Sequence, residues 1–132
     1  MVNDPMDEVA SIRKILIGVV GPCGSGKSTL TAGLTRLGYR SRHIAQEHSY
    51  VKDMWQRLTK PDILVFLDAS WLVTCQRRRL DWTEAEWQEQ QCRLRHARQH
   101  ADLVLDTDGI SIDEVLQRVV RFVVERFENI GI

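Results

Sequence analysis

Nine residues near the start of the chain, Gly-Pro-Cys-Gly-Ser-Gly-Lys-Ser-Thr at positions 21–29, constrain its fold more than any other segment. An apolar, β-branched run ends at Val20, directly before them. After them, Leu30, Leu34 and Leu37 recur at helical spacing, and Gly38 then provides a stop signal. The pattern predicts a strand over 14–20, a glycine-rich loop, and a helix over 27–37.

The spacing within this loop suits a phosphate group. It fits G-x-x-x-x-G-K-[ST] at every fixed position, and loops of this pattern hold phosphate oxygens on backbone N–H groups at the positive end of a helix. Lys27 would contact the β- and γ-phosphates, and the Ser28 hydroxyl would be a ligand of Mg²⁺. We therefore expect a nucleoside triphosphate, ATP or GTP, bound with Mg²⁺ by the loop residues Gly21, Cys23, Gly24, Ser25, Gly26, Lys27, Ser28 and Thr29.

The rest of the chain alternates between strand and helix patterns. Strands are expected over 39–45, 62–68 and 101–105, and helices over 48–58, 70–80, 83–100 and from 111 onward. Thr83 with Glu86, and Ser111 with Glu114, have the spacing of capping boxes. The alternation predicts one α/β domain over 1–132, a three-layer α/β/α fold with a small, mostly parallel sheet of about four strands. Residues 1–12 are expected to form a flexible arm.

Composition narrows the expected partners. Lys plus Arg and Asp plus Glu both total 18, so the formal net charge is zero and no basic field favours nucleic acid. The three cysteines have no metal-like spacing, which favours a reducing, cytoplasmic setting. No apolar stretch approaches the roughly 20 residues that a membrane span needs. We expect a small-molecule partner, without membrane or nucleic acid, and leave open a homodimer.

Three segments resemble the P-loop kinases of nucleotides and small metabolites, which include adenylate, thymidylate, shikimate and dephospho-coenzyme A kinases. The loop has their G-x-x-G-S-G-K-S-T form. Residues 61–70, followed by Arg77, Arg78 and Arg79, are similar to their strand and lid, and residues 95–109 to their last helix, strand and base-side loop. The resemblance implies a P-loop fold and a compact kinase, a phosphotransferase that moves the γ-phosphate of ATP to a nucleotide or small metabolite.

The resemblance also implies roles for residues outside the loop. Arg77 lies where lid arginines reach the adenine or the phosphates, and it joins Lys27 as a candidate catalytic residue. Arg93 and Arg95 are candidates for further phosphate contacts. Asp108 and Gly109 belong to the turn that lines the base pocket in these kinases. The alternative for the arginines is a solvated helix face, paired with the nearby acids Asp81, Glu84, Glu86 and Glu89.

Two carboxylates are candidates for supporting Mg²⁺. Asp68 ends an apolar run, as does the acid that helps to hold Mg²⁺ in these kinases, yet the residues after it match the later strand that leads into the lid. In that second register Asp68 is structural and the acid-bearing strand is missing. Glu47 follows the second expected strand, where these kinases place an acceptor-side carboxylate. It is then the candidate base or Mg²⁺ support, with His48 as an alternative base.

Three classes of function remain open at this stage. A compact kinase is favoured by Glu47, and we take it as the leading hypothesis. A nucleotide-binding switch or slow NTPase is favoured by the short span between Gly38 and Pro61. A subunit with a vestigial loop, whose tryptophans bind a partner, is disfavoured by the intact Lys27-Ser28-Thr29 sequence.

Overall fold

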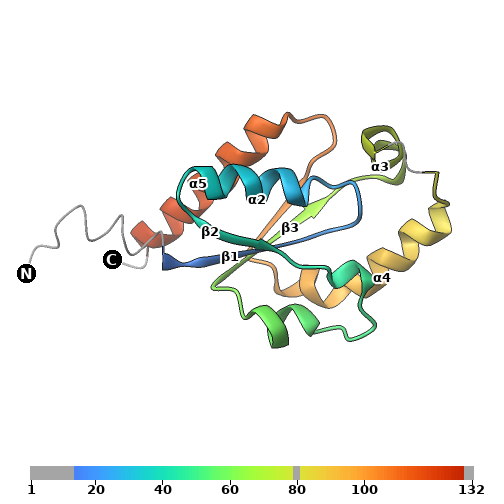
Figure 1. Cartoon of the computed structure of the whole chain (residues 1–132), viewed down its shortest axis with the longest axis horizontal. Helices are drawn as coiled ribbons and strands as arrows, with labels where there is room; N and C mark the ends of the chain where they lie inside the picture. Colours follow the sequence, from blue (N-terminus) through green and yellow to red (C-terminus); the bar gives the residue numbers. More distant parts are fainter. Residues whose placement is uncertain (1–13, 79–80, 130–132) are drawn as a thin grey trace, which may run out of the picture.

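A four-stranded, all-parallel sheet organises the part of the chain that the computed structural model describes, residues 14–78 and 81–129 (Figure 1). The strands lie in the order β2-β1-β3-β4. Their bounds are β1 (Leu16–Val20), β2 (Arg40–His43), β3 (Ile63–Asp68) and β4 (Leu103–Asp106). The helical elements are α2 (Lys27–Arg36), η1 (Gln46–His48), η2 (Trp55–Thr59), α3 (Trp71–Arg78), α4 (Glu84–His100) and α5 (Ile112–Asn129). The arm expected over 1–12 and Arg79 lie outside the described residues.

The position of each strand follows from its side chains. β3 reads Ile-Leu-Val-Phe-Leu-Asp, and its five apolar residues are buried, which suits a central strand covered on both faces. β2 reads Arg-Ser-Arg-His and is largely exposed. A strand of this polarity belongs at a sheet edge, where its charges oppose pairing with another chain. The polarity of β2 thus accounts for its place at the edge of the sheet.

Helices cover both faces of the sheet and create two apolar cores. On one face, Leu34 of α2 and Val119 of α5 pack against Ile17 and Val65. On the other face, α4 and η2 cover Phe66 and its neighbours (Figure 1). Each fully buried apolar side chain of this size contributes roughly 1.5–3 kcal/mol to stability. The predicted α/β fold with about four strands in three layers is confirmed, and all four strands are parallel.

The last two helices begin where their capping residues predict. Thr83 Oγ1 accepts a hydrogen bond from Glu86 N at 3.2 Å, and the Glu86 carboxylate accepts one from Thr83 N at 3.3 Å. Thr83 is therefore the N-cap of α4, which begins at Glu84. Ser111 Oγ accepts from Glu114 N at 3.1 Å at the start of α5. Of the helices within the described ranges, none is both long and apolar enough to span a membrane.

The helix expected over 48–58 does not form, and that prediction was wrong. The chain instead makes the single 3₁₀ turn η1, a loop, and the π-helical turn η2. The buried Gln46 is the physical reason. Its Nε2 donates to Val51 O at 2.9 Å, and its Oε1 accepts from Trp55 N at 2.9 Å, so a side chain replaces helical backbone bonds. Among the apolar residues of this segment Trp55 is buried, whereas Val51 and Leu58 are exposed.

Candidate functional site

The glycine-rich loop joins the carboxyl end of β1 to the start of α2, and close packing requires two of its glycines. A Cβ at Gly21 would stand 2.1 Å from the carbonyl oxygen of Leu67 in β3. Gly24 has a φ of +84°, and a Cβ there would lie 3.0 Å from Cβ of Thr74 in α3. The loop therefore rests directly on β3 and α3, which hold its backbone in one shape.

A cavity of about 710 Å³ lies along this loop, at the carboxyl ends of the strands. Its volume falls in the range of about 300–1,000 Å³ that is usual for small-molecule sites. The expected loop residues from Cys23 to Thr29 line it, whereas Gly21 does not. Its charged lining has an excess of cations, which favours an anionic ligand. These charged residues are Lys27, Arg36, Arg77, Arg78, Glu47 and Asp113.

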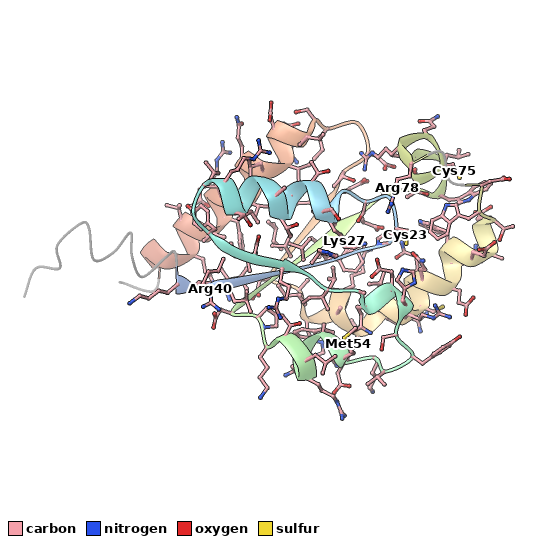
Figure 2. The ribbon with its side chains drawn as sticks, in the orientation of Figure 1. Cys23, Lys27, Arg40, Met54, Cys75 and Arg78 are labelled. Atoms are coloured by element: carbon pink, nitrogen blue, oxygen red, sulfur yellow. The ribbon has the colours of Figure 1, made fainter. Side chains whose placement is uncertain are left out.

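Lys27 forms the central ion pair of the cavity. Its Nζ lies 2.6 Å from Glu47 Oε2, and the two side chains are 10% and 4% exposed. The ammonium also donates to the carbonyl oxygens of Gly21 at 2.8 Å and Pro22 at 3.1 Å. Its three N–H groups are thus matched by three acceptors. Figure 2 shows Lys27 near Cys23 and Arg78, which line the same cavity.

Glu47 reaches Lys27 because Gln46 anchors η1. The Gln46 side chain, fully buried, bonds to the loop after η1 and donates to Arg93 O of α4 at 3.3 Å. Arg93 in turn donates to the Glu47 carbonyl oxygen at 3.2 Å. With Oε2 on Lys27, Glu47 Oε1 is buried and has no hydrogen-bond partner among the described residues. Glu47 Oε1 can therefore accept a hydrogen bond or bind a cation.

Cys23 and His48 form a second contact beside Glu47. Cys23 Sγ lies 3.6 Å from His48 Nε2. Gln90 of α4 donates to Cys23 Sγ at 3.4 Å and accepts from Cys23 N at 3.0 Å, so it holds both ends of the residue. The sequence indicated Cys23 as a loop residue and His48 as an alternative base. Their contact and the role of Gln90 were missed, since residues so far apart in the chain show no common pattern.

Arg77 lines the cavity from α3, and Thr107 holds it there. Arg77 Nη1 donates to Thr107 Oγ1 at 2.7 Å, and Arg77 Nη2 donates to the Thr107 carbonyl oxygen. Thr107 Oγ1 donates to the carbonyl oxygen of Asp68 at 2.9 Å and lies 3.3 Å from that of Ser25. The buried Thr107 thus joins α3, the ends of β3 and β4, and the loop. Arg77 is fixed at the cavity wall by these contacts.

The turn after β4 contributes residues other than those the resemblance implied. Thr107 and Ile110 line the cavity, whereas Asp108 and Gly109 do not. Asp108 Oδ1 accepts from Ser70 N at 3.1 Å and so fixes the segment that leads into α3. Gly109 has a φ of +75°, which allows the chain to turn toward α5. Both residues shape the wall of the site without reaching the cavity.

Asp68 lies outside the cavity, and other groups bind its carboxylate. Its Oδ2 is 2.6 Å from Arg98 Nη1, and its Oδ1 accepts from Gln91 Nε2 at 3.0 Å and from Ala69 N at 2.9 Å. The structure therefore does not bring Asp68 together with Ser28, the other predicted metal ligand. β3 also pairs with β1 on the side away from β2. This arrangement agrees with the second register, in which Asp68 is structural.

The two other arginines that were candidates for phosphate contacts do not line the cavity, and three tryptophans bond to the protein itself. Arg93 pairs with Glu89 at 2.5 Å, and its side chain is only 19% exposed. Neither Arg93 nor the exposed Arg95 lines the cavity. Trp71, Trp82 and Trp87 are part-buried, and each donates its indole N–H to the protein. The acceptors are Trp82 O, Thr74 Oγ1 and Ala69 O respectively.

No protein-family model matches this chain, and no curated protein matches it. The chemistry of the cavity must therefore be inferred from its own residues. The resemblance to P-loop kinases stays a prediction, which depends on residues 21–29, 61–70 and 95–109.

Proposed function

We propose that the chain binds a nucleoside triphosphate with Mg²⁺ and transfers its γ-phosphoryl group to a small acceptor. One observation carries this proposal. The loop that fits G-x-x-x-x-G-K-[ST] lies between the carboxyl end of a parallel strand and the start of a helix, beside a cavity with an excess of cations. This strand–loop–helix arrangement is the context in which the motif binds phosphate. A glycine turn with a purely structural role would not need the cavity or its cations.

The start of α2 is suited to the phosphates. Its N-cap is Gly26, and no side chain caps the helix, so its first N–H groups are not occupied by a side-chain acceptor. Free N–H groups at a helix N-terminus, together with the helix dipole, form a binding site for anions. Lys27 can exchange the Glu47 carboxylate for a phosphate oxygen. Arg77 and Arg78 add forked guanidinium donors from α3, the geometry that best matches phosphate oxygens.

Ser28 and Glu47 are the residues that would hold Mg²⁺. Ser28 is exposed and lines the cavity, and Glu47 offers the buried oxygen that has no hydrogen-bond partner. Bound Mg²⁺ would neutralise charge on the phosphate oxygens. In the same proposal, Glu47 would accept a proton from an acceptor hydroxyl. Asp68 has no part in this proposal, because Arg98, Gln91 and Ala69 bind its carboxylate outside the cavity.

Slow hydrolysis of the nucleotide, as in a switch, is the second candidate, and the sheet favours it. β2 pairs directly with β1, with Leu16 opposite Arg40, so no acid-bearing strand lies between them within the described ranges. The connection from β2 to β3 contains only η1 and η2. This short connection offers little surface on which a phosphate acceptor could be held. A chain of this kind would pass the phosphoryl group to water.

Calorimetric titration of the full chain with Mg–ATP and with Mg–GTP tests the first step. We expect saturable binding of at least one of the two. Adenosine or guanosine serves as the matched control, and it should bind much more weakly because it lacks the phosphates that the loop and the arginines contact. Failure of both triphosphates to bind would overturn the proposal, including its hydrolytic alternative.

The second step separates transfer from hydrolysis. The chain is incubated with Mg–ATP and a panel of nucleotides and hydroxylated metabolites, and phosphorylated product and free phosphate are measured separately. Product supports the kinase, whereas free phosphate alone supports the second candidate. Glu47→Gln should lower transfer by about 10²–10⁴-fold, the usual contribution of a positioned base. Asp68→Asn is the control, and a loss confined to that variant would return the Mg²⁺ role to Asp68.

A further inference from the structure

Cys23, Glu47 and His48 together have the composition of a transition-metal site. Their ligand atoms, a thiol sulfur, a carboxylate oxygen and an imidazole nitrogen, all lie within 4.8 Å of one another. In the described ranges this is the one such group of three or more metal-ligating side chains. Zn²⁺ accepts all three donor types, whereas Mg²⁺ and Ca²⁺ prefer oxygen. We propose that this cluster binds a zinc-class divalent cation through three protein ligands and leaves a fourth position open.

The separation of two of the donors already fits tetrahedral coordination. Zinc lies about 2.3 Å from a cysteine sulfur and about 2.0–2.1 Å from a histidine nitrogen. At a tetrahedral angle of about 109°, these lengths place the sulfur and the nitrogen about 3.5–3.6 Å apart. The distance between Cys23 Sγ and His48 Nε2 is 3.6 Å. These two side chains would therefore need little rearrangement to share one ion.

The third donor supplies independent evidence for a ligand. Glu47 is 3% exposed, and its Oε1 has no hydrogen-bond partner among the described residues. An unsatisfied acceptor of this kind costs about 1–3 kcal/mol in a folded protein. A cation held between Glu47, Cys23 and His48 would satisfy that oxygen, while Oε2 keeps its contact with Lys27.

Gln90 acts as a positioning residue for the thiol. It is 7% exposed, its Nε2 lies 3.4 Å from Cys23 Sγ, and its Oε1 accepts from Cys23 N at 3.0 Å. Partners of this kind orient the ligands of known metal sites. The amide of Gln90 therefore fixes the position of the sulfur that would bind the metal.

The cation site shares Glu47 with the proposed catalytic site, but it needs no nucleotide. A bound cation would occupy the carboxylate that we propose as the base of transfer. Zn²⁺ should therefore act as an inhibitor of the chain's phosphoryl transfer. Because metal binding is measured without nucleotide, its outcome is independent of the calorimetry with ATP and GTP.

Titration of the nucleotide-free full chain with Co²⁺, under inert gas and with a non-chelating phosphine reductant, tests the site. We expect a thiolate-to-cobalt charge-transfer band in the near ultraviolet, which Zn²⁺ then abolishes by displacement. Cys23→Ser should lose the band, and His48→Gln should weaken binding more than about tenfold, since even partners outside the first coordination shell contribute about 10–100-fold. The matched control is Cys92→Ser, which removes an exposed cysteine outside the cluster and should leave band and affinity unchanged.

Two results would overturn the inference. One is a wild-type chain without a thiolate band. The other is a band that persists in Cys23→Ser, whichever of the other cysteines supplies it. Circular dichroism of each variant checks that it is folded. His48→Gln is the safeguard, because His48 is exposed and its replacement does not disturb a core. His96 and His100 cannot imitate the signal, since a thiolate band requires sulfur.

Discussion

The buried pair of Lys27 and Glu47 gives a quantitative test of how the site is held together. The charged atoms are 2.6 Å apart, and the side chains are 10% and 4% exposed. Lys27→Met removes the ammonium and leaves a buried carboxylate without its partner. Removing one member of a buried ion pair typically costs about 3–5 kcal/mol. We expect Lys27→Met to lower the free energy of unfolding by about that amount, a large part of the roughly 5–15 kcal/mol usual for a domain.

Glu47→Gln should cost less, about 1–3 kcal/mol, because the Lys27 ammonium keeps the carbonyl oxygens of Gly21 and Pro22 and gains an amide oxygen. The double variant buries neither charge and should be more stable than Lys27→Met alone. Urea unfolding followed by the fluorescence of the four tryptophans measures all three variants by linear extrapolation. The expected coupling energy between the two sites exceeds about 1 kcal/mol.

An exposed pair in the same chain provides the control. Arg57 and Asp53 lie 2.9 Å apart, with side chains 69% and 25% exposed. Arg57→Met should cost less than about 1 kcal/mol, because water screens a surface pair. The reasoning is refuted if the two single costs at Lys27 and Glu47 add to within about 0.5 kcal/mol in the double variant. It is refuted equally if Lys27→Met is no more destabilising than Arg57→Met.

Three further predictions concern the framework of the site. The first concerns His96, whose Nδ1 accepts from Trp55 Nε1 at 3.1 Å. Burial lowers the pKa of His96, and the charges of His100 and Lys52 lower it further, whereas Asp53 acts in the opposite direction. Below the ordinary histidine pKa of about 6.5, the unfolded chain therefore binds a proton more readily than the folded chain. The contribution of neutral His96 to the free energy of unfolding is present above about pH 6.5 and is lost as the pH falls. Urea unfolding at several pH values should show that the free energy of unfolding falls less on acidification in His96→Asn than in the wild type. Gly24→Ala should lower the free energy of unfolding more than Gly26→Ala. Both glycines have positive φ, but only at Gly24 would the added Cβ lie against Thr74. Equal costs of the two variants in urea unfolding would contradict this packing argument. Thr107→Val should lower the free energy of unfolding by about 1–3 kcal/mol, because it removes the hydroxyl that lies between Arg77 and the Asp68 carbonyl oxygen. Thr107→Ser keeps the hydroxyl and should retain most of the thermal stability.

Local patterns in the sequence predicted the elements that form the sheet and its helices. The apolar run that becomes β3 favours a buried strand, because five consecutive apolar residues are unfavourable in water. Thr83 and Glu86 determine the start of α4 through bonds that lie within four residues. The helix over 48–58 could not be judged in this way. A buried glutamine replaced its backbone bonds, and that burial depends on packing against Arg93 of α4.

The sequence by itself determined the strand, the glycine loop and the helix that places Lys27 and Ser28 at the cavity, because these residues are adjacent and interact through their own backbone. Only the tertiary structure decided which side chains meet them. Glu47 reaches Lys27, and His48 reaches Cys23, because parallel pairing of β1 and β2 brings their carboxyl ends together at one edge of the sheet. The same arrangement turns Asp68 toward Arg98 of α4 and away from the cavity. Contacts between distant segments depend on how the whole sheet and its helices pack, and no short pattern encodes them.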